Sequence, residues 1–98
     1  MTAKHVAWFS FKPGVSDERI DEHMRAVQTL ADVVPFVSGV DCGKSYTDRA
    51  DGLTHCIIVT LPDRESLPQY LEHPAHVPIA EALVGDIAEL RVMDLDLG

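Results

Sequence analysis

The chain has 98 residues, of which 46% are apolar and 24% charged, and this profile predicts a single globular domain over residues 1–98. Sixteen Asp and Glu residues outnumber eight Lys and Arg residues, so the formal net charge is −8, and we expect neither nucleic acid nor an anionic membrane as a partner. No apolar run approaches the roughly 20 residues of a spanning helix, and the N-terminus does not resemble a signal peptide, so we expect a cytoplasmic protein.

The segment 4–12 (KHVAWFSFK) is dense in β-branched and aromatic residues and predicts the first strand. Side chains alternate along a strand, so one face of it carries His5, Ala7, Phe9 and Phe11. The opposite face carries Val6, Trp8 and Ser10. Large apolar side chains thus stand on both faces, and both faces need cover.

A helix is predicted between Ser16, which is placed to cap it, and Pro35, which cannot continue it. Asp17 and Glu18 suit the positive end of its dipole. Apolar residues at helical spacing form one stripe along it, made of Ile20, Met24, Val27, Ala31 and Val34, with His23 and Leu30 beside the stripe.

Residues 37–46 predict a second strand, in which Gly39 and Gly43 are expected bulge or bend points. A polar turn over residues 48–52 leads to a third strand over residues 54–61 (THCIIVTL). Its two faces are again both apolar, with His55, Ile57 and Val59 on one side and Cys56, Ile58 and Thr60 on the other.

The last third of the chain predicts two short helices and a strand. The first helix begins after Pro62-Asp63 and ends before Pro74, because the residue before a proline avoids the α region. The second covers residues 77–84, and Gly85 fits its end. The fourth strand covers residues 89–97.

The resulting order, β-α-β-β-α-β, predicts an α+β chain with a ferredoxin-like sheet whose helices lie on one side. If the face with His5 and Ile57 meets the helices, the other face is bare and carries Val6, Trp8, Cys56 and Ile58. A bare apolar sheet in water is a liability, and stacking on a second copy about a two-fold axis removes it. We therefore expect a homodimer that forms through the open sheet face.

No metal or cofactor is expected. Cys42 and Cys56 are too few and too far apart for a metal site and should be free thiols in a reducing cytosol, although an approach across the hairpin would allow them to pair. His73 and His76 are three residues apart, but Pro74 breaks the regular helix that would align them on one metal ion.

Three segments carry a resemblance that spans essentially the whole chain. They are Lys4-His5-Val6 with Phe11-Lys12-Pro13-Gly14-Val15, then Leu53-Thr54-His55 with Val59-Thr60, and the most specific, Tyr70-Leu71-Glu72-His73-Pro74-Ala75-His76. On these segments the chain resembles the stress-responsive dimeric α/β-barrel family, often called Dabb. The resemblance implies a homodimer whose two sheets close into one barrel, with the helices outside.

One branch of that family, similar to olivetolic acid cyclase, closes a ring in a linear polyketide thioester by aldol condensation, in a pocket between sheet and helices. Its catalytic Tyr and His fall on Tyr70 and His76, and its pocket His on strand one falls on His5. The resemblance therefore implies that these three residues are catalytic. On the residues alone, a packing role for Tyr70 and a capping or packing role for His76 stay open.

The chemistry of these residue types fits an aldol closure. A neutral His removes a proton next to a carbonyl, and a helix N-terminus just after His76 disfavours the charged imidazolium. A Tyr hydroxyl donates to the enolate oxygen, and aliphatic walls hold the substrate chain folded. The walls of this pocket are expected to include Ala7, Phe9, His23, Met24, Val27, Ile57, Val59, Leu90 and Val92.

His23 and Val27 depart from the cyclase branch, where helix one is bulky and aromatic and the position of Val27 is a Tyr. The pocket would gain an imidazole and lose a phenol, which favours a different and more polar ligand. The other interpretation of His23 is a solvated residue on the face of the helix.

Two functions follow. The first is a cofactor-independent cyclase or lyase that acts on a polyketide-like or other carbonyl compound, with His76 as base, Tyr70 as donor and His5 assisting. The alternative is a non-catalytic stress-responsive dimer whose pocket binds a small hydrophobic ligand.

Overall fold

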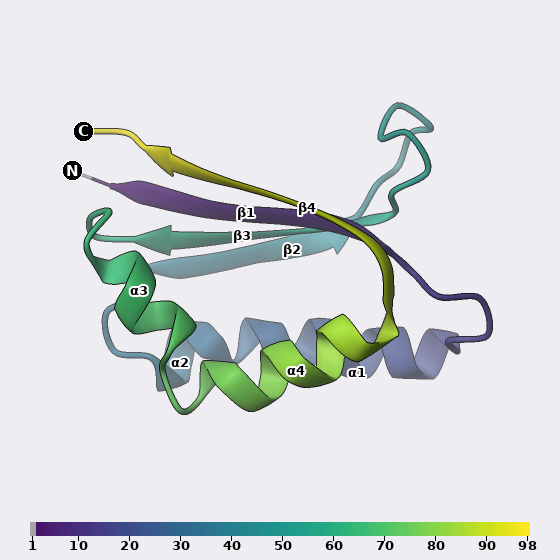
Figure 1. Ribbon diagram of the computed structural model, residues 1–98, viewed down its shortest axis with the longest axis horizontal. Helices are drawn as coiled ribbons and strands as arrows, with labels where there is room; N and C mark the ends of the chain where they lie inside the picture. The colour runs from purple at the N-terminus through teal and green to yellow at the C-terminus, as the bar shows by residue number, and fades with distance from the viewer. Residues whose placement is uncertain (1) are drawn as a thin grey trace.

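A computed structural model describes residues 2–98 and shows two layers, a four-stranded sheet with the helices on one side of it (Figure 1). The elements in chain order are β1 (Ala3–Phe11), α1 (Asp17–Gln28), α2 (Leu30–Val33), β2 (Gly39–Lys44), β3 (His55–Leu61), α3 (Ser66–Leu71), α4 (His76–Asp86) and β4 (Ile87–Asp96). This is the ferredoxin-like α+β arrangement expected from the sequence. In the described part of the chain, no helix has the length and apolar character needed to cross a bilayer.

The strands are ordered β2-β3-β1-β4, and every neighbouring pair is antiparallel. This register places His5 of β1 between Val59 of β3 and Asp94 of β4. The ladder between β1 and β4 shifts only between Ser10 and Phe11. Both chain ends lie at the same edge of the molecule, where the Leu97 amide donates to the Thr2 carbonyl (2.9 Å; Figure 1).

The core lies between the sheet and the helices, and the face assignment made from the two-residue period is confirmed. Phe9 and Val59 are fully buried under the helices. Helix α1 packs against β2, and α4 packs against α1 and α3. No helix of residues 2–98 lies on the other face of the sheet (Figure 1).

The predicted long helix is in fact two helices that meet at Thr29. The Thr29 hydroxyl donates to the Ala26 carbonyl (2.6 Å), and the helix continues as α2 for one turn before Pro35. The buried side of α1 is centred on His23 and Val27, whereas Ile20 and Met24 are only partly buried. The buried side of α1 is therefore rotated about the helix axis relative to the stripe predicted from apolar residues alone, because it includes His23.

In the β2–β3 hairpin the expected glycine bulges are absent, whereas the expected free thiols are confirmed. The register between β2 and β3 is regular through Gly39 and Gly43, so neither glycine forms a bulge. Cys42 pairs with Ile57 on the helix side, whereas Cys56 pairs with Gly43 and Trp8 on the open side. Because the two thiols lie on opposite faces of the sheet, they are free and cannot approach each other across the hairpin.

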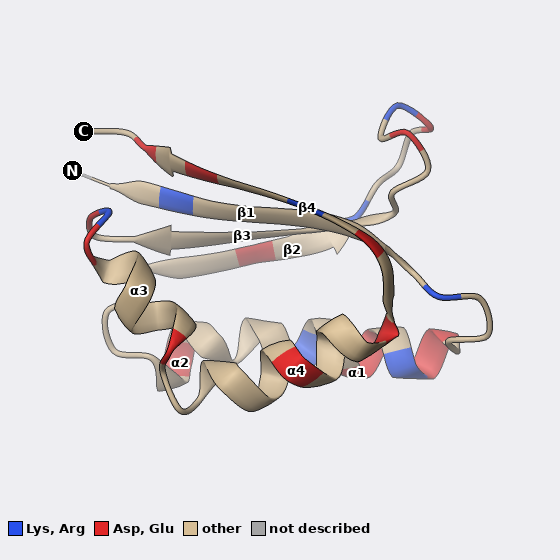
Figure 2. Cartoon of the chain, in the orientation of Figure 1, with Lys and Arg blue, Asp and Glu red and all other residues tan. Residues whose placement is uncertain are grey.

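Most charged side chains lie in the loops, the helices and the outer strands; of the two inner strands, β1 carries only Lys4 and β3 carries no Lys, Arg, Asp or Glu (Figure 2). The central part of the sheet therefore presents mainly apolar side chains to both of its faces.

Candidate active site

A cavity of about 360 Å³ lies between the sheet and helix α4. Most of its wall is aliphatic or aromatic. Its polar groups gather at one end, where His5 and Asp94 project from the sheet and Tyr70 and His76 from the helical layer. The apolar remainder of the wall includes Phe9, Val27, Leu30, Leu83 and Ile87.

Tyr70 lies between two histidines at the polar end. Its ring centroid is 5.9 Å from that of His5 and 4.4 Å from that of His76. The side chain comes from the last turn of α3, is only 2% exposed, and burial raises its pKa to about 12. The phenol therefore stays protonated at neutral pH and can donate a hydrogen bond into the cavity.

His76 is the first residue of α4, whereas the sequence predicts a helix that begins one residue later. Its Nδ1 lies 3.0 Å from the Leu71 carbonyl oxygen, and because a carbonyl only accepts, Nδ1 carries the proton. The Nε2 atom of the neutral ring then has a free lone pair. Burial lowers the pKa of His76, His5 and His73 lower it further, and the hydrogen bond to Leu71 opposes them. Neutral His76 is therefore a base with a fixed tautomer.

His5 has a partner that the sequence analysis missed. Its Nδ1 lies 2.5 Å from Asp94 Oδ1, the residue directly opposite it on β4. The carboxylate accepts from Nδ1–H, and this hydrogen bond orients the ring. The alternation of Leu90, Val92 and Asp94 could have placed this side chain on the cavity face of β4, but its pairing with His5 follows only from the strand register.

Six of the nine residues expected in the pocket wall do line this cavity, namely Ala7, Phe9, Val27, Ile57, Leu90 and Val92. Three lie elsewhere. Val59 is fully buried in the core, and Met24 packs against that core from α1. His23 is neither in the cavity nor solvated: it is 5% exposed, stacks on Phe11, and its Nε2 donates to Asp86 Oδ2 (2.7 Å).

His55 and His73 bond locally. His55 Nδ1 lies 2.8 Å from the Thr54 hydroxyl, and His73 Nδ1 accepts from the Ala75 amide (3.0 Å) in the bend before α4. Neither lines the cavity. Among residues 2–98, no three His, Cys, Asp or Glu side chains are grouped so that they could hold a metal ion.

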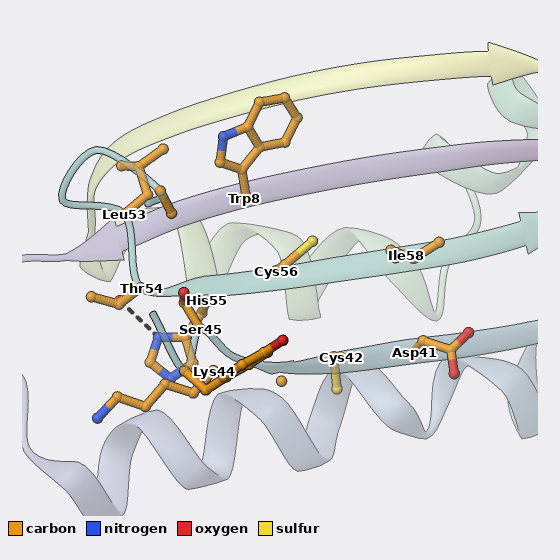
Figure 3. Close-up of a pocket in the computed structure, with 13 residues that line it drawn as sticks. Trp8, Asp41, Cys42, Lys44, Ser45, Leu53, Thr54, His55, Cys56 and Ile58 are labelled. Carbon is orange, nitrogen blue, oxygen red and sulfur yellow. Dashed lines mark hydrogen bonds between the residues drawn. The ribbon is translucent and has the colours of Figure 1, made fainter. Parts of the chain in front are cut away.

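A second hollow, of about 500 Å³, lies mainly on the open side of the sheet (Figure 3). Trp8, Cys56 and Ile58 line it from the sheet, and Leu53 lines it from the β2–β3 loop. Tyr46 in the same loop is 97% exposed. This hollow contains none of the four polar groups of the cavity under the helices.

Comparison with known proteins extends these observations. Residues 3–96 match the family described as Dabb, Stress responsive A/B Barrel Domain. The chain is 33% identical over 93 residues to stress-response A/B barrel domain-containing protein HS1 of Arabidopsis thaliana, covering 93% of this chain and 85% of that protein. It is 27% identical over 96 residues to olivetolic acid cyclase of Cannabis sativa, covering 96% and 95%.

Solved structures show the same fold. A hydroxynitrile lyase from Passiflora edulis superposes with a TM-score of 0.91 at 19% identity, covering 99% of this chain and 94% of that one. A dimeric ferredoxin-like protein from Thermobifida fusca superposes with a TM-score of 0.86 at 18% identity, covering 99% and 92%.

Proposed function

The chain belongs to the Dabb family of stress responsive A/B barrel domains, and we propose that its cavity binds a small carbonyl compound and catalyses aldol-type carbon–carbon chemistry, as a cyclase or lyase. One observation carries the proposal: a protonated, buried Tyr70 lies between two histidines whose Nδ1 atoms are both held by acceptors, at one end of an apolar cavity. Similarity to olivetolic acid cyclase supports the reaction class, and the fold is shared with a hydroxynitrile lyase.

In the proposed reaction His76 Nε2 takes a proton from the carbon next to a carbonyl. The electron pair forms an enolate, and the Tyr70 hydroxyl donates to the enolate oxygen. The enolate carbon then attacks a second carbonyl of the same molecule, which forms the carbon–carbon bond. The new alkoxide recovers the proton from His76, so no external oxidant, reductant or cofactor takes part.

The apolar wall supports this sequence of steps. A hydrogen bond to a developing oxyanion is stronger in a water-poor site than in bulk solvent. The same wall holds an apolar chain so that its two reacting carbonyls stay together. In the reverse direction these groups would cleave a bond between a hydroxyl-bearing carbon and its neighbour, which is the lyase form of the chemistry.

The proposal is tested by incubating the protein with a linear poly-β-keto thioester and identifying the products. Enzymic ring closure through carbon gives a carbocyclic product, whereas the free thioester closes through oxygen to a lactone. An increased carbocyclic fraction in the presence of protein supports a cyclase. Saturable binding with an unchanged product ratio would instead favour a non-catalytic ligand-binding protein.

The pH dependence of kcat/KM should have an acid limb and no alkaline limb from Tyr70. Burial places the pKa of His76 below its usual 6.5, so the base is neutral at pH 7 and is lost only as the pH falls through that lowered value. Tyr70 keeps its proton up to about 12. A rate profile measured in buffers of constant ionic strength checks both limbs, and a fall in rate on the alkaline side well below that value would argue against Tyr70 as the donor.

Asp94→Asn should lower kcat while the protein stays folded. The neutral amide oxygen accepts from His5 Nδ1–H more weakly than a carboxylate does, and the amide NH₂ can instead donate to Nδ1, so His5 loses its fixed tautomer. We expect a loss of at least about tenfold, smaller than the about 10²- to 10⁴-fold effect of removing a general base. Steady-state kinetics with a matched melting curve measures it. Asp96→Asn, on the same strand and exposed, is the control.

We also propose that the functional unit is a homodimer formed through the open sheet face. On that face the strands carry two cations, Lys4 and Arg91, and two anions, Asp41 and Glu89. A face with no net charge, in a chain whose net charge is −8, lets two copies approach without strong repulsion. Met93 and Leu95 on the same face are 52% and 39% exposed, and a second copy would cover them.

A further inference from the structure

His23, Arg19 and Asp86 form a polar clamp outside the cavity. The Asp86 carboxylate accepts from His23 Nε2 (2.7 Å) and from Arg19 Nε (3.0 Å), both through Oδ2. These hydrogen bonds, first from His23 and then from Arg19, lower the pKa of Asp86. The clamp joins α1 to the last residue of α4.

The turn after β1 also binds this C-terminal end of α4. The Lys12 amide donates to the Asp86 carbonyl (2.8 Å), and Lys12 Nζ donates to the Gly85 carbonyl (2.8 Å). The C-terminal end of α4 is therefore fixed by four hydrogen bonds from β1–α1 residues. Leu83 and Ile87 lie on either side of this C-terminal end in the sequence, and both line the cavity. The position of the end of α4 therefore determines where the apolar end of the cavity closes.

Between its two ends α4 borders a space on each side. The ligand cavity lies on its inner side, and a cleft of about 280 Å³ lies between α1 and α4 on its outer side. Ile79 borders both spaces, and His23 and Arg19 border the outer one. Leu83 is buried in the core and Ile79 packs against it, so the hydrogen bonds at the C-terminal end of α4 add to this packing in holding the helix at its distance from the sheet.

We propose that the clamp of His23, Arg19 and Asp86 positions α4 as the wall of the cavity and thereby limits the length of the apolar chain that the cavity accepts. The three residues are positioning residues, since they act on the ligand only through α4. The inference depends on the proposed function only in that the cavity must bind a carbonyl compound with an apolar tail; it does not require turnover.

The test uses a series of methyl n-alkyl ketones as probes, with binding measured by calorimetry. For the wild type, each added CH₂ should tighten binding about three- to fourfold until the tail fills the cavity, and further CH₂ groups should then add nothing. In His23→Leu and Asp86→Ala the loosened α4 should allow the gain to continue for at least about one further CH₂. His23→Gln, whose amide nitrogen can donate to Asp86 in place of Nε2, should keep the wild-type limit.

Hydrogen exchange of the α4 amides (residues 76–86) tests whether the clamp holds α4, independently of whether α4 limits the length of the ligand's tail. Exchange should be faster in His23→Leu and Asp86→Ala than in the wild type and His23→Gln, and unchanged in the control Glu18→Gln, an exposed acid on α1 outside the clamp. A limiting tail length that is the same in every variant overturns the inference, whatever the exchange rates. If no ketone binds the wild type, the proposed function fails, and unchanged α4 exchange in His23→Leu would overturn the clamp as well.

Discussion

Replacing His76 with alanine is expected to lower kcat/KM on a carbonyl substrate by about 10²- to 10⁴-fold, the usual contribution of a general base. The structure gives the imidazole a single tautomer through the Leu71 carbonyl and a lowered pKa through burial. Both features leave Nε2 free of a proton at neutral pH. Among the polar groups of the cavity, His76 is the one that moves a proton in the proposed steps, and alanine removes it.

Tyr70→Phe is the companion variant, because it removes the hydroxyl and keeps the buried ring. Loss of one oxyanion donor should lower kcat by about 10²- to 10³-fold. His55→Gln is the matched control, since it removes an imidazole that lies under the helices but does not line the cavity. Turnover in His76→Ala within a few-fold of the wild type, with product ratios unchanged, would contradict the assigned base.

Ile58→Glu is expected to convert the proposed homodimer into a monomer. Ile58 lies on the inner strand β3, on the open face, and lines the hollow there (Figure 3). A dimer through this face would bury the new carboxylate without a partner, which costs several kcal/mol. Since each 1.4 kcal/mol is about tenfold in an equilibrium constant, dissociation should become easier by about 10²-fold or more.

Sedimentation equilibrium at micromolar concentration measures this effect. Val33→Glu is the control, because Val33 is also apolar but is exposed on α2, on the helix side of the molecule. The wild type and Val33→Glu should sediment as dimers, and Ile58→Glu as a monomer with a near-normal circular dichroism spectrum. A wild type that is monomeric at these concentrations would refute dimerisation through this face.

The parts of the fold that depend on local patterns could be predicted from the sequence. The two-residue period assigned His5, Ala7 and Phe9 to the helix side of β1, and the structure has them there. The same period placed Trp8 and Ile58 on the open side. Alternation needs no knowledge of distant residues, so a single strand reveals its two faces.

The parts that depend on distant pairing could not be predicted. Asp86 lies 63 residues after His23, and nothing local to α1 shows that a carboxylate will take up its imidazole. Asp94 lies 89 residues after His5, and their pairing follows from the register between β1 and β4. A buried histidine therefore looked like a pocket residue or a solvated one until its partner was known, and an acidic residue on an edge strand looked like ordinary surface charge.

The most direct test of the account is enolate formation, which needs no knowledge of the natural substrate. Methyl pentyl ketone is incubated in D₂O with the protein, and the loss of its α-proton signals is followed by NMR. The wild type should accelerate exchange above the buffer rate, His76→Ala should return it to that rate, and Tyr70→Phe should lie between. Exchange that is equally fast with the wild type and with His76→Ala would contradict the claim that His76 and Tyr70 form the reactive centre of this cavity.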